Sequence, residues 1–182
     1  DSYLNIADTI SSLTKQIVDS CYNLLDENTL KSVVETLYNS NRIFIYALGD
    51  CYIGAESFIY KLTKIDCYAY MLNNYSYSLV NLHNIKEDDC ILILSTTGKT
   101  LTLESKTIRL ICESRAKTIL ITSMNSYDFS HKFDYILNIF HGEDKILKIG
   151  SLASQVSIIY ILNVLYSCLY EIDYNKNNER IE

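Results

Sequence analysis

The feature that most constrains the fold is a set of short, continuous apolar runs. In a sheet with one face in water, polar and apolar residues would alternate along each strand, and these runs show no such alternation. Five runs are expected to be strands: Ile43–Leu48, Asp66–Leu72, Ile91–Leu94, Thr118–Thr122 and Tyr135–Ile139. Segments with helical spacing separate them, including Tyr52–Thr63 and Leu101–Arg115, with a short helix expected at Tyr75–Leu82. Strands buried on both faces and alternating with helices indicate a parallel sheet. The sequence therefore predicts an α/β fold, a three-layer α/β/α sandwich with a five-stranded parallel sheet.

Helices are expected at both ends of this sheet. Residues 3–22 and Glu27–Tyr38 carry apolar side chains at helical spacing, and Asp26 is a suitable N-cap for the second segment. We expect residues 1–41 to form two leading helices packed on a domain spanning 42–172. Its last helix is predicted at Ser151–Glu171, and the polar tail 173–182 is expected to be frayed.

Composition limits the function classes. A formal net charge of −6 argues against this chain gripping nucleic acid through its own surface. The six cysteines contain no CxxC pair and favour buried free thiols in a reducing cytoplasm. No secretory leader is visible at the start, and Val156–Tyr170 falls short of the roughly 20 apolar residues of a membrane span. We expect a cytoplasmic protein with no membrane partner, no metal and no cofactor.

A cluster of hydroxyl side chains follows the third predicted strand, in the segment Cys90–Thr100, CILILSTTGKT. A strand, a Ser/Thr/Gly turn and a helix start can hold a phosphate through backbone N–H groups, the helix dipole and directed hydroxyls. The segment is not a P-loop, because that motif requires glycine at the position of Ile93. An ordinary helix start with Thr100 as N-cap explains the turn equally well.

A second glycine turn, Gly49-Asp50-Cys51, follows the first predicted strand. In a sheet of order 2-1-3-4-5 the first and third strands are neighbours at the switch point, where ligands bind beyond the carboxyl ends. Gly49 and Gly98 would then face one crevice. The spacing of Gly49 and Gly54 is not a dinucleotide fingerprint.

A third element opens the last helix, where Ser151 and Gln155 lie one turn apart on the same side. Together ALGDCYIGA, ILILSTTGKT and SLASQVSIIYILNVLY resemble the SIS (sugar isomerase) phosphosugar-binding domain, from about Arg42 to Glu171. Within that family the chain looks most like the C-terminal effector domain of RpiR transcriptional regulators, whose N-terminal helix-turn-helix domain is absent here.

The resemblance implies that Ser95, Thr97 and Thr100, with the backbone around Gly98, hold a sugar phosphate. It also places the last helix at a dimer interface. The full set of ligand-binding residues expected on this basis is Gly49, Asp50, Cys51, Ser95, Thr96, Thr97, Gly98, Lys99, Thr100, Ser151 and Gln155.

Four positions depart from the family pattern. Lys99 replaces the more usual Glu or Asp in the turn, Cys51 replaces a hydroxyl residue, and Leu152 stands where an Arg is expected. Asp50 adds an anion near the proposed phosphate, which opposes binding. The predicted site is therefore an atypical version of the family's site.

Two functions follow from this reading. As a sensor, a homodimer or larger oligomer would bind a sugar phosphate and act on DNA only through an N-terminal domain outside this chain. As an aldose–ketose isomerase it would need a general base, for which Glu143 or His141, after the fifth predicted strand, are the candidates. Glu56 and Glu104, on the two motif helices, are further candidates, whereas His83 and His131 have no partner visible in the sequence. The absence of a convincing base favours sensing over catalysis.

Overall fold

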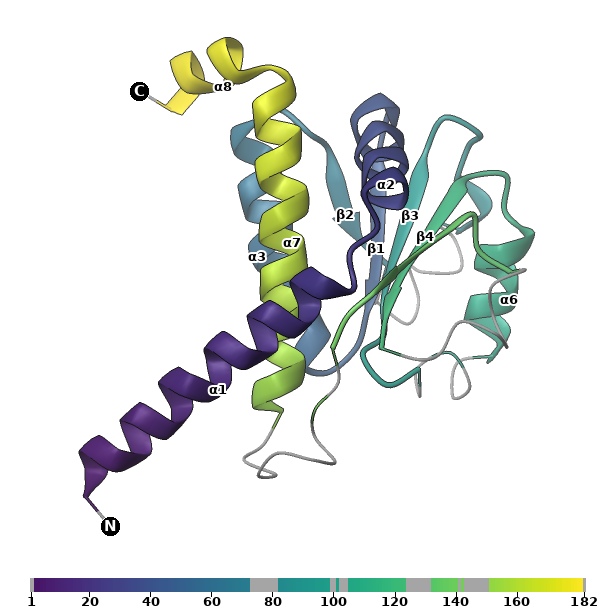
Figure 1. Cartoon of the computed structure of the whole chain (residues 1–182). Helices are drawn as coiled ribbons and strands as arrows, with labels where there is room; N and C mark the ends of the chain where they lie inside the picture. Colours follow the sequence, from purple (N-terminus) through teal and green to yellow (C-terminus); the bar gives the residue numbers. More distant parts are fainter. Residues whose placement is uncertain are drawn as a thin grey trace.

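A computed structural model of the chain describes residues 2–72, 82–98, 101, 105–123, 132–140, 142 and 151–181. Its centre is a five-stranded parallel sheet of order β2-β1-β3-β4-β5 (Figure 1). The strands are β1 (Ile43–Ala47), β2 (Ala69–Met71), β3 (Cys90–Leu94), β4 (Lys117–Thr122) and β5 (Tyr135–Asn138). The predicted fold class and strand order are confirmed, since every pair of neighbouring strands is parallel.

The central strands are apolar throughout because both of their faces are covered. All five residues of β3 are buried, and Leu92 lies in register between Ile45 of β1 and Ile119 of β4. Alternate residues along each strand supply two separate hydrophobic cores. Ile45 and Leu92 enter one core, whereas Phe44 and Ile91 enter the other.

The helices form the two outer layers (Figure 1). One core is shared with helices α1 (Tyr3–Asn23), α2 (Glu27–Asn39), α3 (Asp50–Lys64) and α7 (Leu152–Ile172), and the opposite core with α6 (Ser105–Glu113). Of the helix predicted at Leu101–Arg115, Leu101 and α6 are helical, and 102–104 lie outside the described residues. The helix predicted at Tyr75–Leu82 lies outside them except for Leu82, which is helical.

Helix α7 is the most apolar of the described helices. Among the described helices it is the one that is long and apolar enough to cross a membrane by length and composition. Its side chains Ile158, Ile161, Leu165 and Leu169 are buried in the core against the sheet and helices α1 and α3. The composition of α7 is therefore accounted for by its central position.

The polar tail is helical, which corrects the expectation of a frayed end. Helix α8 (Tyr174–Ile181) follows α7 after a turn at Asp173. Asn177 is buried and its Nδ2 donates to the carbonyl of Tyr170 at 2.9 Å, while Arg180 Nη2 donates to Asp66 Oδ2 at 2.8 Å. These tertiary bonds hold a segment whose own sequence favours no helix.

A buried ion pair fastens the amino ends of β1 and β3. The carboxylate of Asp89 accepts from Arg42 Nε at 2.9 Å and from Arg42 Nη2 at 2.6 Å. The backbone N–H of Lys86 donates to the same carboxylate at 2.8 Å, and Arg42 Nη2 also donates to the carbonyl of Asn84 at 3.0 Å. The side chain of Asp89 is fully buried and that of Arg42 is 29% exposed, so the pair lies at the edge of the core with its carboxylate out of contact with solvent.

Candidate functional site

The chain turns sharply where β1 and β3 end. Gly49, the N-cap of α3, has φ 58°, and Gly98 has φ 70°. Residues that carry a Cβ rarely adopt such positive φ values. A Cβ built on Gly49 would meet no atom within 4 Å, so backbone conformation rather than crowding requires this glycine. The turn after β3 closes by the bond from the Gly98 N–H to the carbonyl of Ser95, at 3.3 Å.

Cys51 joins the two turns. Its thiol is buried, and the burial raises its pKa even though the N–H and hydroxyl of Thr96 hydrogen-bond to the sulfur. The carbonyl of Thr96 in turn accepts bonds from the backbone N–H of Ser123, at 3.0 Å, and from its hydroxyl. The thiol is therefore neutral at physiological pH.

A cavity of about 240 Å³ lies where these turns meet the start of α7. Seven described residues line it: Leu48, Asp50, Cys51, Thr96, Thr97, Ser151 and Ser154. Five of them were predicted from the sequence, and they come from three segments far apart along the chain. The cavity lies beyond the carboxyl ends of β1 and β3, at the switch point of the sheet.

The other predicted residues lie around this cavity or outside the described part of the chain. Gly49, Ser95 and Gly98 belong to the turns without lining the cavity. Gln155 is exposed, and its Nε2 donates to Ser151 Oγ at 3.4 Å. Four predicted residues lie outside the described residues: Lys99, Thr100, His141 and Glu143.

Ser95 carries an unusual hydroxyl. The residue is 2% exposed, and its Oγ has no hydrogen-bond partner among the described residues. Its backbone is fixed, because its N–H donates to the carbonyl of Ile121 at 3.0 Å. A buried hydroxyl without a partner costs about 1–3 kcal/mol.

The electrostatics of the cavity combine two opposing contributions. The amino ends of α3 and α7 meet there, and the N-cap Ser151 makes no side-chain capping bond, so free N–H groups and both helix dipoles favour an anion. Asp50 opposes an anion, and no Lys or Arg stands among the described lining residues. The described groups therefore suit a ligand that presents a phosphate and several hydroxyls.

Catalytic groups are scarce at the cavity. Asp50 is the one carboxyl among the described lining residues, and none of these residues is a histidine. Glu56 is exposed on α3 and hydrogen-bonds to Tyr52, whose pKa it raises, while His83 is exposed near the opposite end of the sheet. The described side chains supply hydrogen-bond donors and acceptors but no buried, tuned base.

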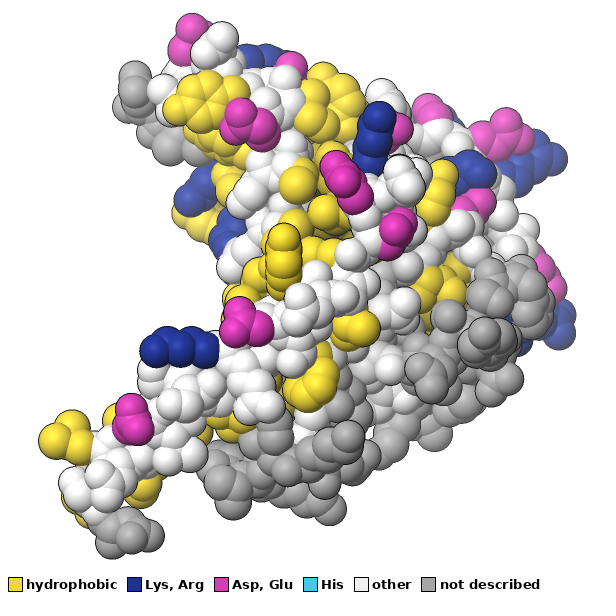
Figure 2. Space-filling model, in the orientation of Figure 1, with side chains coloured by type: hydrophobic (Ala, Val, Ile, Leu, Met, Phe, Trp, Pro, Cys, Tyr) yellow, Lys and Arg dark blue, Asp and Glu magenta, His cyan; other side chains and the backbone are white. Residues whose placement is uncertain are grey.

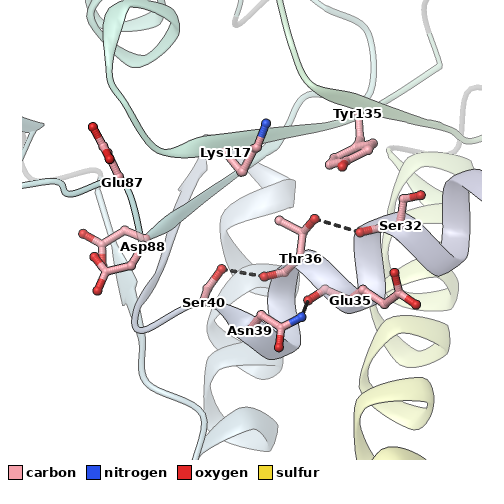
Figure 3. A pocket seen from close by; sticks show the side chains of 10 residues that line it. Ser32, Glu35, Thr36, Asn39, Ser40, Glu87, Asp88, Lys117 and Tyr135 are labelled. Atoms are coloured by element: carbon pink, nitrogen blue, oxygen red, sulfur yellow. Dashed lines mark hydrogen bonds between the residues drawn. The ribbon is translucent and has the colours of Figure 1, made fainter.

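A second cavity, of about 320 Å³, lies at the amino ends of the strands (Figure 3). Its hydroxyl and amide groups are already used, since Thr36, Asn39 and Ser40 donate to carbonyls of α2 at 2.6–2.8 Å. Carboxylates surround it, among them Glu35 and Asp88 (Figure 3). Its position, opposite the ligand-binding end of the sheet, and its negative charge make it unsuited to a phosphate.

Sequence reasoning missed Leu48 and Ser154. Leu48 was assigned to the strand, whereas the strand ends at Ala47 and leaves Leu48 in the turn. Ser154 is 5% exposed and lies three residues after Ser151, on the same side of α7. That spacing was the available signal for Ser154.

The comparisons with known proteins agree with this geometry. The sequence profile of the SIS domain matches residues 36–167, so the chain belongs to the SIS domain family. It is 23% identical to an uncharacterized HTH-type transcriptional regulator of Haemophilus influenzae over 94% of this chain and 59% of that protein. The chain thus spans about three fifths of the length of this curated relative.

Two solved structures share the fold. The Vibrio vulnificus NanR protein complexed with ManNAc-6P superposes with a TM-score of 0.82 at 19% identity, over 95% of this chain and 65% of that chain. The sugar isomerase domain of the RpiR transcription factor from Sphaerobacter thermophilus superposes with a TM-score of 0.81 at 12% identity, over 96% of this chain and 95% of that chain. The resemblance inferred from the sequence motifs is therefore confirmed.

Proposed function

We propose that this SIS domain is the phosphosugar-sensing effector domain of an RpiR-type transcriptional regulator. The observation that carries the proposal is the cavity at the switch point, where two helix amino ends and hydroxyl side chains meet without a described base. The regulator relative from Haemophilus influenzae and the NanR complex with a sugar phosphate support the same assignment.

In the proposed complex the phosphate lies against the hydroxyl turn. The hydroxyl and backbone N–H of Thr97 donate to its oxygens. Lys99 and Thr100, predicted from the sequence, complete this end.

The sugar extends toward the start of α7. There Ser151 and Ser154 line the cavity, and Gln155 stands beside Ser151. Hydroxyl and amide groups of this kind can both donate to and accept from the hydroxyls of a sugar.

The remaining partners follow from this role. The chain carries a formal net charge of −6, so contact with DNA is assigned to a helix-turn-helix domain outside this chain. We also assign the protein to the cytoplasm and to a homodimer or larger assembly. Ligand binding then acts by favouring one arrangement of that assembly, with an effect limited by its differential affinity.

A sugar-phosphate isomerase is the second candidate, because the same cavity would hold the same substrate. That reaction needs a base beside the carbon-bound proton, a role that Glu143 or His141 would have to fill. Incubation of the protein with any sugar phosphate that binds, followed by NMR of the sugar, tests this alternative. Formation of the isomeric sugar would establish catalysis.

Thermal denaturation with a panel of hexose, pentose and amino-sugar phosphates tests binding. A ligand at 100 times its Kd stabilises a protein by about 2.7 kcal/mol, which raises the Tm of a chain this size by roughly 5–11 °C. Thr97→Val, which removes one hydroxyl from the cavity, is expected to reduce this shift by at least half. Thr36→Val removes a hydroxyl from the opposite cavity and serves as the matched control.

Two outcomes would contradict the proposal. One is that no member of the panel raises the Tm at millimolar concentration. The other is that Thr97→Val and Thr36→Val respond to the ligand alike, which would mean that the sugar phosphate does not bind at the hydroxyl turn.

A further inference from the structure

One carboxylate at the switch-point cavity lies apart from any cation. Asp50 is the one charged side chain among the described residues that line the cavity, and it is exposed. Within the described part of the chain, its carboxylate takes part in no hydrogen bond and no ion pair. Elsewhere acidic side chains lie beside basic ones at several places on the face in Figure 2. Three such exposed carboxylates pair with a cation at 2.8–3.2 Å, in Arg115–Glu87, Lys117–Asp134 and Arg180–Asp66.

The position of Asp50 in α3 accounts for part of its role. As the first residue of the helix, it places a carboxylate at the positive end of the α3 dipole, a favourable position for an anion. This helix end is therefore already supplied with a negative charge, and a ligand phosphate beside it would be repelled. The phosphate consequently belongs at the hydroxyl turn, and the space beside Asp50 is left for a neutral or positive group.

The cavity thus has two chemically different sides. The hydroxyl turn at Thr96 and Thr97 and the amino end of α7 favour an anion, whereas Asp50 favours a cation. A sugar phosphate without an amino group leaves the carboxylate unpaired and close to a second negative charge. A sugar phosphate with an ammonium group satisfies both sides, because the ammonium offsets this repulsion and donates a charge-assisted hydrogen bond to Asp50.

We propose that Asp50 determines the specificity of the site and that the ligand is a 2-amino-2-deoxyhexose 6-phosphate with a free ammonium group. The inference rests on the proposed function and names its ligand class. In such a sugar the phosphate and the ammonium group lie on opposite sides of one ring, so they can reach two walls of the cavity. The cavity volume of about 240 Å³ lies below the usual range of about 300–1,000 Å³ for small-molecule pockets, which suits one sugar ring rather than a nucleotide sugar.

Calorimetric titration with sugars that differ at one carbon tests this assignment. The probes are glucose 6-phosphate, glucosamine 6-phosphate and N-acetylglucosamine 6-phosphate, and the same three compounds of the mannose series. EDTA in the buffer prevents a divalent cation from bridging the phosphate and Asp50. In at least one series the wild type is expected to bind the amino sugar about 10-fold or more tightly than its two counterparts, the lower part of the range for a carboxylate and an ammonium group about 4 Å apart near a protein surface.

Asp50→Asn should reduce this preference at least about 5-fold, because it weakens binding of the amino sugar and strengthens binding of the uncharged one. The ratio of two affinities in one protein cancels any effect of the substitution that both ligands share. Asp50→Glu keeps the charge and should retain more of the preference than Asp50→Asn. Asp88→Asn removes an equal charge at the opposite end of the sheet and serves as the matched control, with the preference of the wild type.

The outcomes separate the inference from the proposed function. A wild type that binds the probes without preferring the amino sugar would overturn the inference and leave the binding proposal intact. A preference in Asp50→Asn equal to that of Asp88→Asn would do the same, and would restrict Asp50 to the helix dipole. Should circular dichroism show that Asp50→Asn is unfolded, Asp50→Ser replaces it. If no sugar phosphate binds the wild type, the proposed function fails and the inference fails with it.

Discussion

Replacing Arg42 with methionine is expected to destabilise the protein far more than its partly exposed position suggests. Arg42 donates two of the three hydrogen bonds that the buried carboxylate of Asp89 accepts, and the third comes from the N–H of Lys86. Methionine preserves much of the apolar stem over Phe44, whose ring centre lies 5.0 Å from the guanidinium carbon. The substitution therefore isolates the loss of the charge and of its hydrogen bonds.

The magnitude follows from the burial of Asp89. A buried carboxylate that loses its cationic partner costs about 3–5 kcal/mol. In a chain of 182 residues each kcal/mol lowers the Tm by about 2–4 °C, so the expected decrease is roughly 6–20 °C. Arg115→Met is the matched control, because the pair of Arg115 with Glu87 is exposed on both sides and contributes at most about 1 kcal/mol.

The loss of stability in Arg42→Met should also depend on pH. Burial raises the pKa of Asp89, but the hydrogen bonds from Arg42 and Lys86 outweigh it and lower the pKa below its ordinary value. In the wild type this stabilisation is present above the unfolded pKa of about 3.9 and disappears as the pH falls through the lower folded value. In Arg42→Met burial prevails and the folded pKa rises above the unfolded one. The deficit of the variant is therefore largest at neutral pH and shrinks on acidification.

Urea denaturation of the wild type and both variants at neutral pH and near pH 5 measures these differences. The double variant Arg42→Met/Asp89→Leu should recover part of the loss, because it removes the stranded charge. Our reasoning would be refuted by a loss below about 1 kcal/mol at neutral pH, or by one equal to that of Arg115→Met. A deficit that does not shrink on acidification would equally refute it.

Two further predictions concern the cavity and the contact between α3 and α7. Asp50→Asn removes the carboxylate at the cavity and is expected to raise the affinity for a sugar phosphate without an ammonium group by about 3- to 10-fold, the effect of one nearby charge in a well-solvated site. Calorimetric titration at two salt concentrations measures this affinity, and an unchanged Kd would contradict the prediction. Gly54→Ala gains about 1 kcal/mol in helix propensity, but its Cβ meets the stiff, β-branched Ile158 at 2.9 Å, at a cost of about 1–3 kcal/mol. We expect net destabilisation by urea denaturation, with exposed Ser57→Ala nearly neutral; a more stable Gly54→Ala protein would disprove the steric argument.

The sheet could be predicted because its signal is local. An apolar strand such as Cys90–Leu94 that lacks alternation has to be covered on both faces, and the strand order follows from the connections. The edge strand was predicted too long, at Asp66–Leu72 rather than Ala69–Met71. Asp66 has φ 61°, and the N–H of Cys67 donates to the carbonyl of Leu62, so these two residues end α3 and do not extend the strand.

Features that depend on tertiary contacts could not be predicted from the sequence. Helix α8 depends on bonds from Asn177 and Arg180 to residues on other elements, which no local pattern records. The hydroxyl turn and the start of α7 were identified by their residue types, whereas Ser154 could have been found only from its spacing of three residues from Ser151. The unpartnered hydroxyl of Ser95 is visible only once the atoms around it are placed.

Helix α7 gives the proposed sensor a mechanical link between ligand and chain end. Its first turn forms one wall of the cavity, and its body packs against the second half of α1, whose residues 3–12 project beyond that contact as an arm (Figure 1). The arm is about 15 Å long, so a tilt of about 4° at its base moves its first residue by about 1 Å. A displacement of Ser151 on ligand binding would thus be transmitted through α7 to the end of the chain where the proposed DNA-binding domain is attached.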